Sequence, residues 1–228
     1  MSRPAVEHRL MTQGRALITA AVLGGLLYLA GAIALGSPPD ATDSGAKVVA
    51  WFVDHGHNAR VYAWSAALGT LAFAVVAALV RELLPAPHRT VFTIGAAAFV
   101  VENAIQAWVW AGLALHPHSL QPDTARLALD VASFWGPMLT GATTTMMGAV
   151  TVLGFRPDPV IPRWLTALGA IAFAEQAIET ITAFGTHGFI APGGAMNVVL
   201  GAALSLLWLV GLIVWAAPRL PARASFAG

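Results

Sequence analysis

Four carboxylic acids lie within long apolar stretches of this sequence, where a charged group is unfavourable. They are Glu102, Asp130, Glu175 and Glu179. No Lys or Arg lies deep within the same stretches to neutralise them. A carboxylate at the centre of a bilayer costs about 2.5–3.5 kcal/mol on insertion scales. Each acid is therefore expected to face the interior of a helix bundle, to be protonated, or to meet a partner.

Helical spacing places all four acids in three pairs of polar residues, the members of each pair four residues apart on one helix face. The pairs are Glu102–Gln106, Glu175–Glu179 and Arg126–Asp130. Arg126 and Asp130 are predicted to form a salt bridge near the outer surface. Two ionised glutamates repel each other, so Glu175 and Glu179 predict a proton or cation site. The alternative is that protonated carboxyls form hydrogen bonds between helices.

Other kinds of chemistry find little support in the sequence. There is no Cys, which excludes disulfides, iron–sulfur clusters and thiol catalysis. His55-x-His57 and His116-x-His118 would suit a metal site or pH sensing, but solvated or headgroup-facing loop histidines are the favoured interpretation. We therefore predict no catalytic residue, no metal and no cofactor.

The composition is that of an integral membrane protein. Of 228 residues, 57% are hydrophobic and only 10% are charged, against about 25% charged in soluble domains. The mean hydropathy is +0.72. Disorder requires the opposite balance, and a net charge of +1 without a dense basic run excludes a nucleic-acid binder. One all-α membrane domain, residues 1–228, is predicted, with the lipid bilayer as its main partner.

Six apolar stretches are long enough to cross about 30 Å of hydrocarbon. They cover residues 16–36, 61–80, 91–115, 127–154, 164–185 and 196–217. In this arrangement Glu102 and Glu175 both lie near the midplane, 13 residues beyond Arg89 and 12 beyond Arg163. We expect these two acids to approach each other across the bundle interior.

The basic residues predict the orientation. With a cytoplasmic N-terminus, nine fall inside and three outside. The inner set is Arg3, Arg9, Arg15, Arg81, Arg89, Arg156, Arg163, Arg219 and Arg223, and the outer set is Lys47, Arg60 and Arg126. This bias predicts a multi-pass protein of a bacterial inner membrane with both termini in the cytoplasm.

Two irregular features interrupt the simple pattern. In the first outer loop, residues 37–60, Asp43 or Ser44 would cap a short helix whose apolar residues suit the membrane interface, with a lid as the alternative. Gly136-Pro137 is predicted to kink the fourth span. The threonines that follow Pro137 would bond the freed carbonyls or line a polar path.

A short internal similarity relates two pairs of spans. Ala59-Arg60 and Ala125-Arg126 open the second and fourth spans, and Glu-Asn-Ala-Ile-Gln (102–106) resembles Glu-Gln-Ala-Ile-Glu (175–179) in the third and fifth. Both hairpins start outside, so a parallel two-helix repeat would explain the similarity. Chance explains it equally well, because Ala and Ile are common here.

The segment Val160-Ile-Pro-Arg-Trp-Leu-Thr-Ala-Leu-Gly169 resembles the entry to a late span in a bacterial six-span family of unknown function. Gly14-Arg15-Ala16, Gly25-Leu-Leu-Tyr28 and the mid-helix Glu102 are also similar to that family. The resemblance implies the six-span topology and no particular chemistry.

Three functions fit these observations. The leading hypothesis is a transporter-like or sensor-like protein with an outward-facing cavity, lined by carboxylates, that binds a proton, a cation or a small polar solute. Its binding residues would be Glu102, Gln106, Glu175 and Glu179, with Arg126 and Asp130 at the mouth. The alternatives are a structural or accessory subunit whose buried acids join helices, and an isomerase-type or cyclase-type membrane enzyme with a protonated Glu acting on an apolar substrate. The oligomeric state is left open.

Overall fold

The computed structural model describes the backbone of residues 3–220, and it describes the side chains of residues 13–134, 136 and 138–220. The described chain contains helices and no strand, as predicted. The α-helices are α1 (Arg3–Leu35), α2 (Gly45–Val80), α3 (His88–Leu113), α4 (Pro122–Ser133), α5 (Trp135–Thr151), α6 (Arg163–Glu179) and α7 (Ala202–Ala216). Short 3₁₀ segments are η1 (Arg81–Leu83), η2 (Pro117–Ser119), η3 (Val152–Gly154), η4 (Thr180–Phe184), η5 (Gly188–Ile190) and η7 (Ala217–Arg219), and η6 (Met196–Gly201) is a π-helix.

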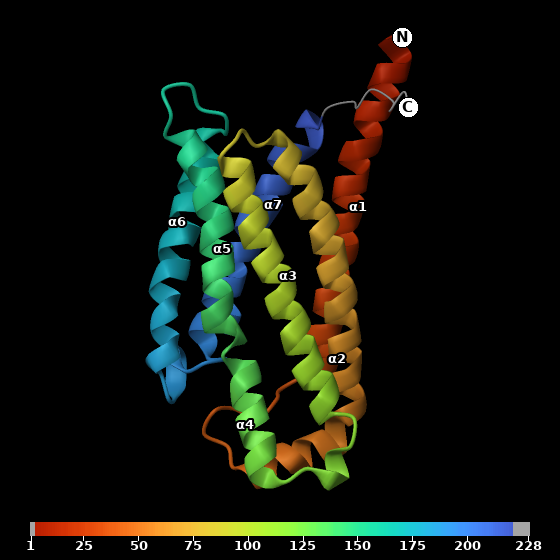
Figure 1. Cartoon of the computed structure of the whole chain (residues 1–228), viewed down its shortest axis with the longest axis vertical. Helices are drawn as coiled ribbons and strands as arrows, with labels where there is room; N and C mark the ends of the chain where they lie inside the picture. The colour runs from red at the N-terminus through yellow and green to blue at the C-terminus, as the bar shows by residue number, and fades with distance from the viewer. Residues whose placement is uncertain (1–2, 221–228) are drawn as a thin grey trace.

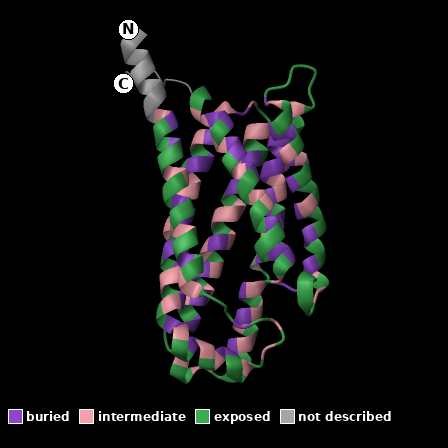
Figure 2. Ribbon diagram, turned by 180° about the vertical axis from the view of Figure 1, so that it is seen from behind, coloured by how far each residue is buried: buried purple, intermediate pink, exposed green. Residues whose placement is uncertain are grey.

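The helices form an elongated bundle (Figure 1). The beginning of α1 and the end of α7 lie at its upper end, where Gly14 packs against the carbonyl of Ala217. Large apolar side chains such as Ile33, Leu71 and Trp108 point outward and are 64–72% exposed. Exposed positions run along the outer sides of the bundle (Figure 2). Such a surface suits contact with lipid.

Four helical stretches are long and apolar enough to cross a membrane. They are Gln13–Leu35, Gly45–Leu83, His88–Leu113 and Met196–Arg219. These correspond to the first, second, third and sixth predicted spans. The membrane-protein class therefore agrees with the structure.

The fourth and fifth predicted spans are each divided. The fourth is split between α4 and α5 at Phe134, immediately before Gly136-Pro137. A proline clashes with the carbonyl four residues earlier, which here belongs to Ser133, so the break falls where the sequence predicted a kink. The fifth is α-helical only to Glu179 and continues as η4. With 17 residues each, α5 and α6 measure about 25 Å, slightly less than the hydrocarbon thickness.

The predicted outer interfacial helix is not a separate element. It forms the first turns of α2, which lie across the lower end of the bundle before the helix runs upward (Figure 1). Ser44 caps it, as expected, by accepting a hydrogen bond from the Lys47 N–H at 3.3 Å. Val48 and Phe52 are fully buried against α3 and α4. The apolar face of this segment therefore packs on other helices and not on the membrane interface.

Candidate functional site

The main polar feature of the interior lies between α5, α6, η4 and η6. We call it the polar cluster, and it consists of Thr143, Glu175, Gln176, Glu179, Thr182 and Asn197. All except the half-buried Glu175 are at most 7% exposed. Two of the predicted site residues, Glu175 and Glu179, therefore belong to one buried network.

Both carboxyl oxygens of Glu179 accept hydrogen bonds from amides. Gln176 Nε2 donates to Oε2 at 2.5 Å, and Asn197 Nδ2 donates to Oε1. The Thr182 hydroxyl donates to the backbone carbonyl of Glu179 at 2.7 Å. Hydrogen bonds to a charged group contribute about 1.5–3 kcal/mol each, so two amide donors can offset the burial of one carboxylate.

Gln176 links the two acids. Its Nε2 also donates to Glu175 Oε2 at 3.1 Å, so both carboxyl groups share one amide donor. Its Oε1 accepts from the Thr143 hydroxyl of α5, and the carboxyl oxygens that face Nε2 orient the amide. The other oxygen of Glu175, Oε1, is buried and has no hydrogen-bond partner.

Two glycines make room for the polar cluster. A methyl group at Gly201 would overlap Glu179 Oε2 and lie 2.9 Å from Gln176 Nε2. A methyl group at Gly136 would lie 3.0 Å from Asn197 Cγ. The absence of a side chain at these positions lets the acid and the amides approach the helix backbone closely.

The polar cluster lies where interrupted helices meet. Gly136 follows the α4–α5 break, and Asn197 belongs to the π-helix that precedes α7. Glu179 is the last residue of α6 before the 3₁₀ turn η4. At membrane depth, irregular backbone occurs only where protein buries it or where it lines a cavity.

Three threonines after Gly136 bond carbonyls within α5 and not, as the sequence analysis expected, the Ser133 carbonyl that Pro137 frees. Hydroxyls of Thr143, Thr144 and Thr145 donate to backbone carbonyls four residues earlier, at 3.1, 2.5 and 2.7 Å. Thr143 also reaches Gln176, so it both bonds the backbone and belongs to the polar cluster.

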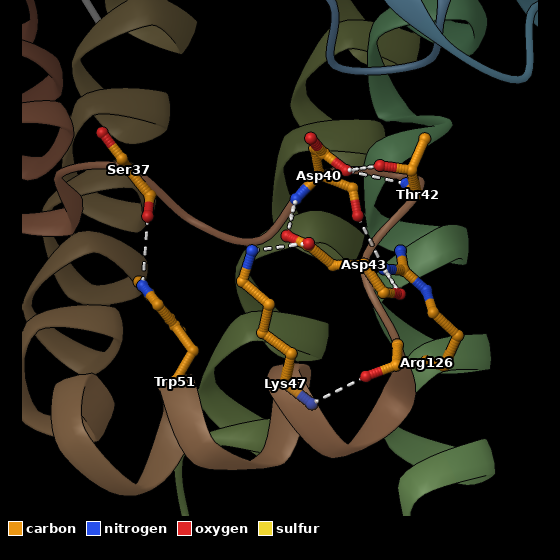
Figure 3. Close-up of polar contacts among 8 residues, drawn as sticks. Ser37, Asp40, Thr42, Asp43, Lys47, Trp51 and Arg126 are labelled. Carbon is orange, nitrogen blue, oxygen red and sulfur yellow. Dashed lines mark hydrogen bonds and ion pairs between the residues drawn. The ribbon is translucent and has the colours of Figure 1, made fainter.

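Arg126 and Asp130 form the predicted salt bridge, with Nη2 and Oδ1 2.5 Å apart. Arg126 Nη1 also donates to the backbone carbonyls of Asp40 and Asp43, at 2.8 and 3.2 Å (Figure 3). Arg126 therefore ties α4 to the α1–α2 loop at the lower end of the bundle. Among the described residues no contact joins this pair to the polar cluster, and the pair links α4 to the loop as a structural clamp.

The loop held by Arg126 is itself tightly folded. The hydroxyl and the backbone N–H of Thr42 donate to Asp40 Oδ1 at 2.6 and 2.7 Å, and these bonds lower the pKa of Asp40. The Lys47 ammonium donates to Asp43 Oδ1 at 2.6 Å, which raises the pKa of Lys47. The indole of Trp51 donates to the carbonyl of Ser37 at 3.1 Å (Figure 3).

Gln106 belongs to a second polar group, between α1, α2 and α3. Gln106 Oε1 accepts from the Tyr62 hydroxyl at 2.8 Å, and Asn103 Oδ1 accepts from the Tyr28 hydroxyl at 3.1 Å. Glu102 is half-buried, and its Oε2 is a buried atom without a partner. The described contacts do not join Gln106 or Glu102 to the polar cluster.

The expected approach of Glu102 to Glu175 is wrong. Gly95 of α3 packs against Met146 of α5, and Thr143, one turn from Met146, bonds to the residue beside Glu175. Glu102 lies two turns beyond Gly95, about 10 Å closer to the lower end. In addition, α5 packs against both α3 and α6, which separates the two acids laterally. They are two independent polar positions.

Sequence reasoning did not single out Gln176, Asn197 or Thr182, which hold the acids in place. One signal existed for Gln176. It is the second residue of Glu-Gln-Ala-Ile-Glu (175–179), the position that Asn103 occupies in the similar segment Glu-Asn-Ala-Ile-Gln (102–106). Both residues are buried and both bond to a neighbouring helix. Asn197 is 18 residues from Glu179 and carried no such signal.

The outer histidines do not assemble a site in the described part of the chain. His55 stacks on Trp51, with ring centroids 4.9 Å apart, and Nδ1 contacts the carbonyl of Trp51 at 3.1 Å. His57 lines a shallow hollow of about 370 Å³ on α2 together with Arg60, Val61 and Trp64. Among the described residues, no group of three or more His, Asp or Glu side chains is arranged to hold a metal ion.

Comparison with known proteins supplies no role for the polar cluster, since no family model, no curated protein and no solved structure matches the chain.

Proposed function

We propose that this protein crosses a bacterial inner membrane six times, with both termini in the cytoplasm, and binds a proton or small cation at the polar cluster. The binding residues are Glu175 and Glu179, held by Gln176 and Asn197. The role is transporter-like or sensor-like. In this proposal α5 and α6, extended by their neighbouring 3₁₀ turns, supply the fourth and fifth spans.

The observation that carries the proposal is the position of Glu179. Its carboxyl is 3% exposed and lies where the α4–α5 break, the end of α6 and the π-helix η6 meet. Interrupted helices at membrane depth are a common way to build ion and substrate sites in transporters. π-helical turns are likewise frequent at functional sites.

The charge balance supports ligand binding. α5, η4, η6 and α7 contribute no basic side chain, so no Lys or Arg on these elements neutralises the pair. Two carboxylates that share one amide donor repel each other when both are ionised. A proton or a cation removes that repulsion.

In the proposed orientation, the polar cluster lies nearer to the outer side of the membrane, and its ligand enters from that side. Glu179 lies at the lower end of α6, and this is the end of the bundle that carries Lys47 and Arg126 (Figure 1). Arg81, Arg89 and Arg163 lie at the opposite end, which the excess of basic residues assigns to the cytoplasm. Because Glu179 is nearly sealed, ligand access requires the lower end of α6 and the following turns to open.

One observation favours the second candidate, an accessory subunit whose acids join helices. Gln176 and Asn197 satisfy both oxygens of Glu179, as expected for a structural link between α6 and η6. The buried, unpartnered Glu175 Oε1 is not explained by that role, because a purely structural acid gains nothing from an unsatisfied oxygen.

Melting curves across pH and cation concentration test the proposal. Ligand-dependent stabilisation follows RT ln(1 + [L]/Kd), so protons or a bound cation should raise the Tm of the wild type. Glu175→Gln should lose this dependence, and Glu82→Gln, which makes the same change on η1 at the other end of the bundle, should keep it. Identical curves for the wild type and Glu175→Gln would favour the accessory subunit.

A further inference from the structure

The polar cluster contains only one carboxyl oxygen without a donor. Glu179 Oε1 and Oε2 accept from Asn197 and Gln176, and Glu175 Oε2 accepts from Gln176. Glu175 Oε1 is buried and has no partner. An ionised oxygen in that position would carry negative charge that neither water nor a hydrogen-bond donor stabilises.

The amide oxygens of the cluster are also engaged. Gln176 Oε1 accepts from the Thr143 hydroxyl, and Asn197 Oδ1 accepts from the Gly193 N–H at 3.3 Å. The Gly193 N–H can only donate, so it fixes the direction of the Asn197 amide, and the carboxyl oxygens that accept from Nε2 fix the direction of the Gln176 amide. Both amides therefore present N–H groups, not carbonyl oxygens, to the acids.

This arrangement is unfavourable for a metal ion. Alkaline-earth ions take about six or more oxygen ligands, whereas Glu179 is surrounded by N–H groups with partial positive charge. For their oxygens to face a cation beside Glu179, both amides would have to reverse, and Asn197 would lose its bond to the Gly193 N–H. A proton needs only one free oxygen, and Glu175 Oε1 provides it.

No other titratable group competes for this role nearby. α5, η4, η6 and α7 carry none, and on α6 the next is Arg163, about 18 Å from Glu175 along the axis. His187 is exposed in the loop after η4, where it bonds Thr186. Glu102 belongs to α3, beyond α5. The electrostatic partner of Glu175 is therefore Glu179.

We infer that the ligand of the polar cluster is a proton, bound at Glu175 Oε1, beside Glu179, whose carboxyl the amides of Gln176 and Asn197 hold in place. This inference rests on the proposed function and narrows its ligand class. Binding adds one proton to the Glu175 carboxylate and lowers the negative charge of the pair by one. Glu175 is half-buried and Glu179 is sealed, so Glu175 is the more accessible of the two acids.

Infrared difference spectra between acidic and alkaline buffer test the inference on the purified full-length protein. The carbonyl stretch of a protonated carboxyl should lose a component in Glu175→Gln. Glu82→Gln, which makes the same change on the 3₁₀ segment η1, should keep that component. Glu175→Asp, which retains a carboxyl, should show it at a shifted frequency and guards against misfolding of the Gln variant.

Melting temperatures with added sodium, potassium, magnesium or calcium chloride complete the experiment. The expected result is that none of these salts stabilises the wild type more than Glu175→Gln. Stabilisation by one cation that requires Glu175 would overturn the proton assignment and leave the proposed function standing. If the infrared component is unchanged in Glu175→Gln and no salt effect depends on Glu175, both the assignment and the proposed function are wrong.

Discussion

The carboxyl of Glu179 is stabilised by amide dipoles instead of a basic side chain. Placing a carboxylate in the membrane interior costs about 2.5–3.5 kcal/mol, and hydrogen bonds to a charged group return about 1.5–3 kcal/mol each. The bonds from Gln176 and Asn197 are therefore sufficient to offset the charge of Glu179. Glu175 accepts a single bond, from the amide donor that it shares with Glu179, so the proposed proton site is on this second acid.

Gly201→Ala should disrupt the polar cluster, because the added methyl group overlaps Glu179 Oε2. The neighbouring atoms would have to shift, at a cost of about 1–3 kcal/mol, or about 2–4 °C in Tm per kcal/mol. Gly141→Ala is the matched control, since nothing lies within 4 Å of its added methyl group. Helix propensity predicts that this control is neutral or stabilising. Equal Tm values for the two variants would contradict the close packing described for Gly201.

The lowered pKa of Asp40 predicts that the α1–α2 loop, at the lower end of the bundle, is sensitive to acid. Because its folded pKa is lowered from 3.8 by the Thr42 hydroxyl and N–H, its contribution to loop stability is present above the unfolded value. It is lost as the pH falls through the lowered folded value. Thr42→Val removes the larger cause and should move the titration midpoint upward. Carboxyl-carbon NMR of Asp40 measures this midpoint, and a wild-type value at or above 3.8 would contradict the assignment.

At the scale of the elements, the sequence predicted what depends on local chemistry. Gly136-Pro137 marked the α4–α5 break, Ser44 marked the beginning of α2, and four-residue spacing marked the Arg126–Asp130 pair. Each of these depends on residues within one turn of one another. For the same reason they could be recognised without a tertiary structure.

Features that depend on contacts between distant elements could not be predicted. The π-helix Met196–Gly201 contains no Pro, and its only Gly is at its end, so no breaker marks it. Its role becomes evident only because Asn197 meets Glu179 and Gly136 across the bundle. The separation of Glu102 from Glu175 similarly depends on α5 lying between their helices, which no local pattern contains.

The whole molecule has two chemically different ends. The end of α2 and the beginnings of α3 and α6 lie at the upper end in Figure 1, and these segments carry Arg81, Arg89 and Arg163. The beginning of α2 and helix α4 lie at the lower end, and they carry Lys47 and Arg126. Arg223, also assigned to the cytoplasm by the sequence, lies outside the described residues. The polar cluster is in the half of α6 nearer the lower end, so the orientation of the protein determines the side from which a ligand enters.

Labelling with a membrane-impermeant thiol reagent tests that orientation. The chain has no Cys, so single cysteines at exposed loop positions report without background. Ser119→Cys, at the lower end, should react on intact cells, and Asp158→Cys, at the upper end, should react only after permeabilisation. The reverse pattern would place the polar cluster toward the cytoplasm.

The difference in Tm between Glu175→Gln and the wild type, followed from neutral to alkaline pH, tests the central claim most directly. The account predicts that Glu175→Gln is the more stable protein and that its advantage grows with pH. The reason is that the amide still accepts from Gln176 while removing a like-charge repulsion of about 1 kcal/mol or more, equivalent to about 2–4 °C. A Tm for Glu175→Gln that is lower than or equal to that of the wild type at every pH would identify Glu175 as a structural link between helices and contradict the binding site.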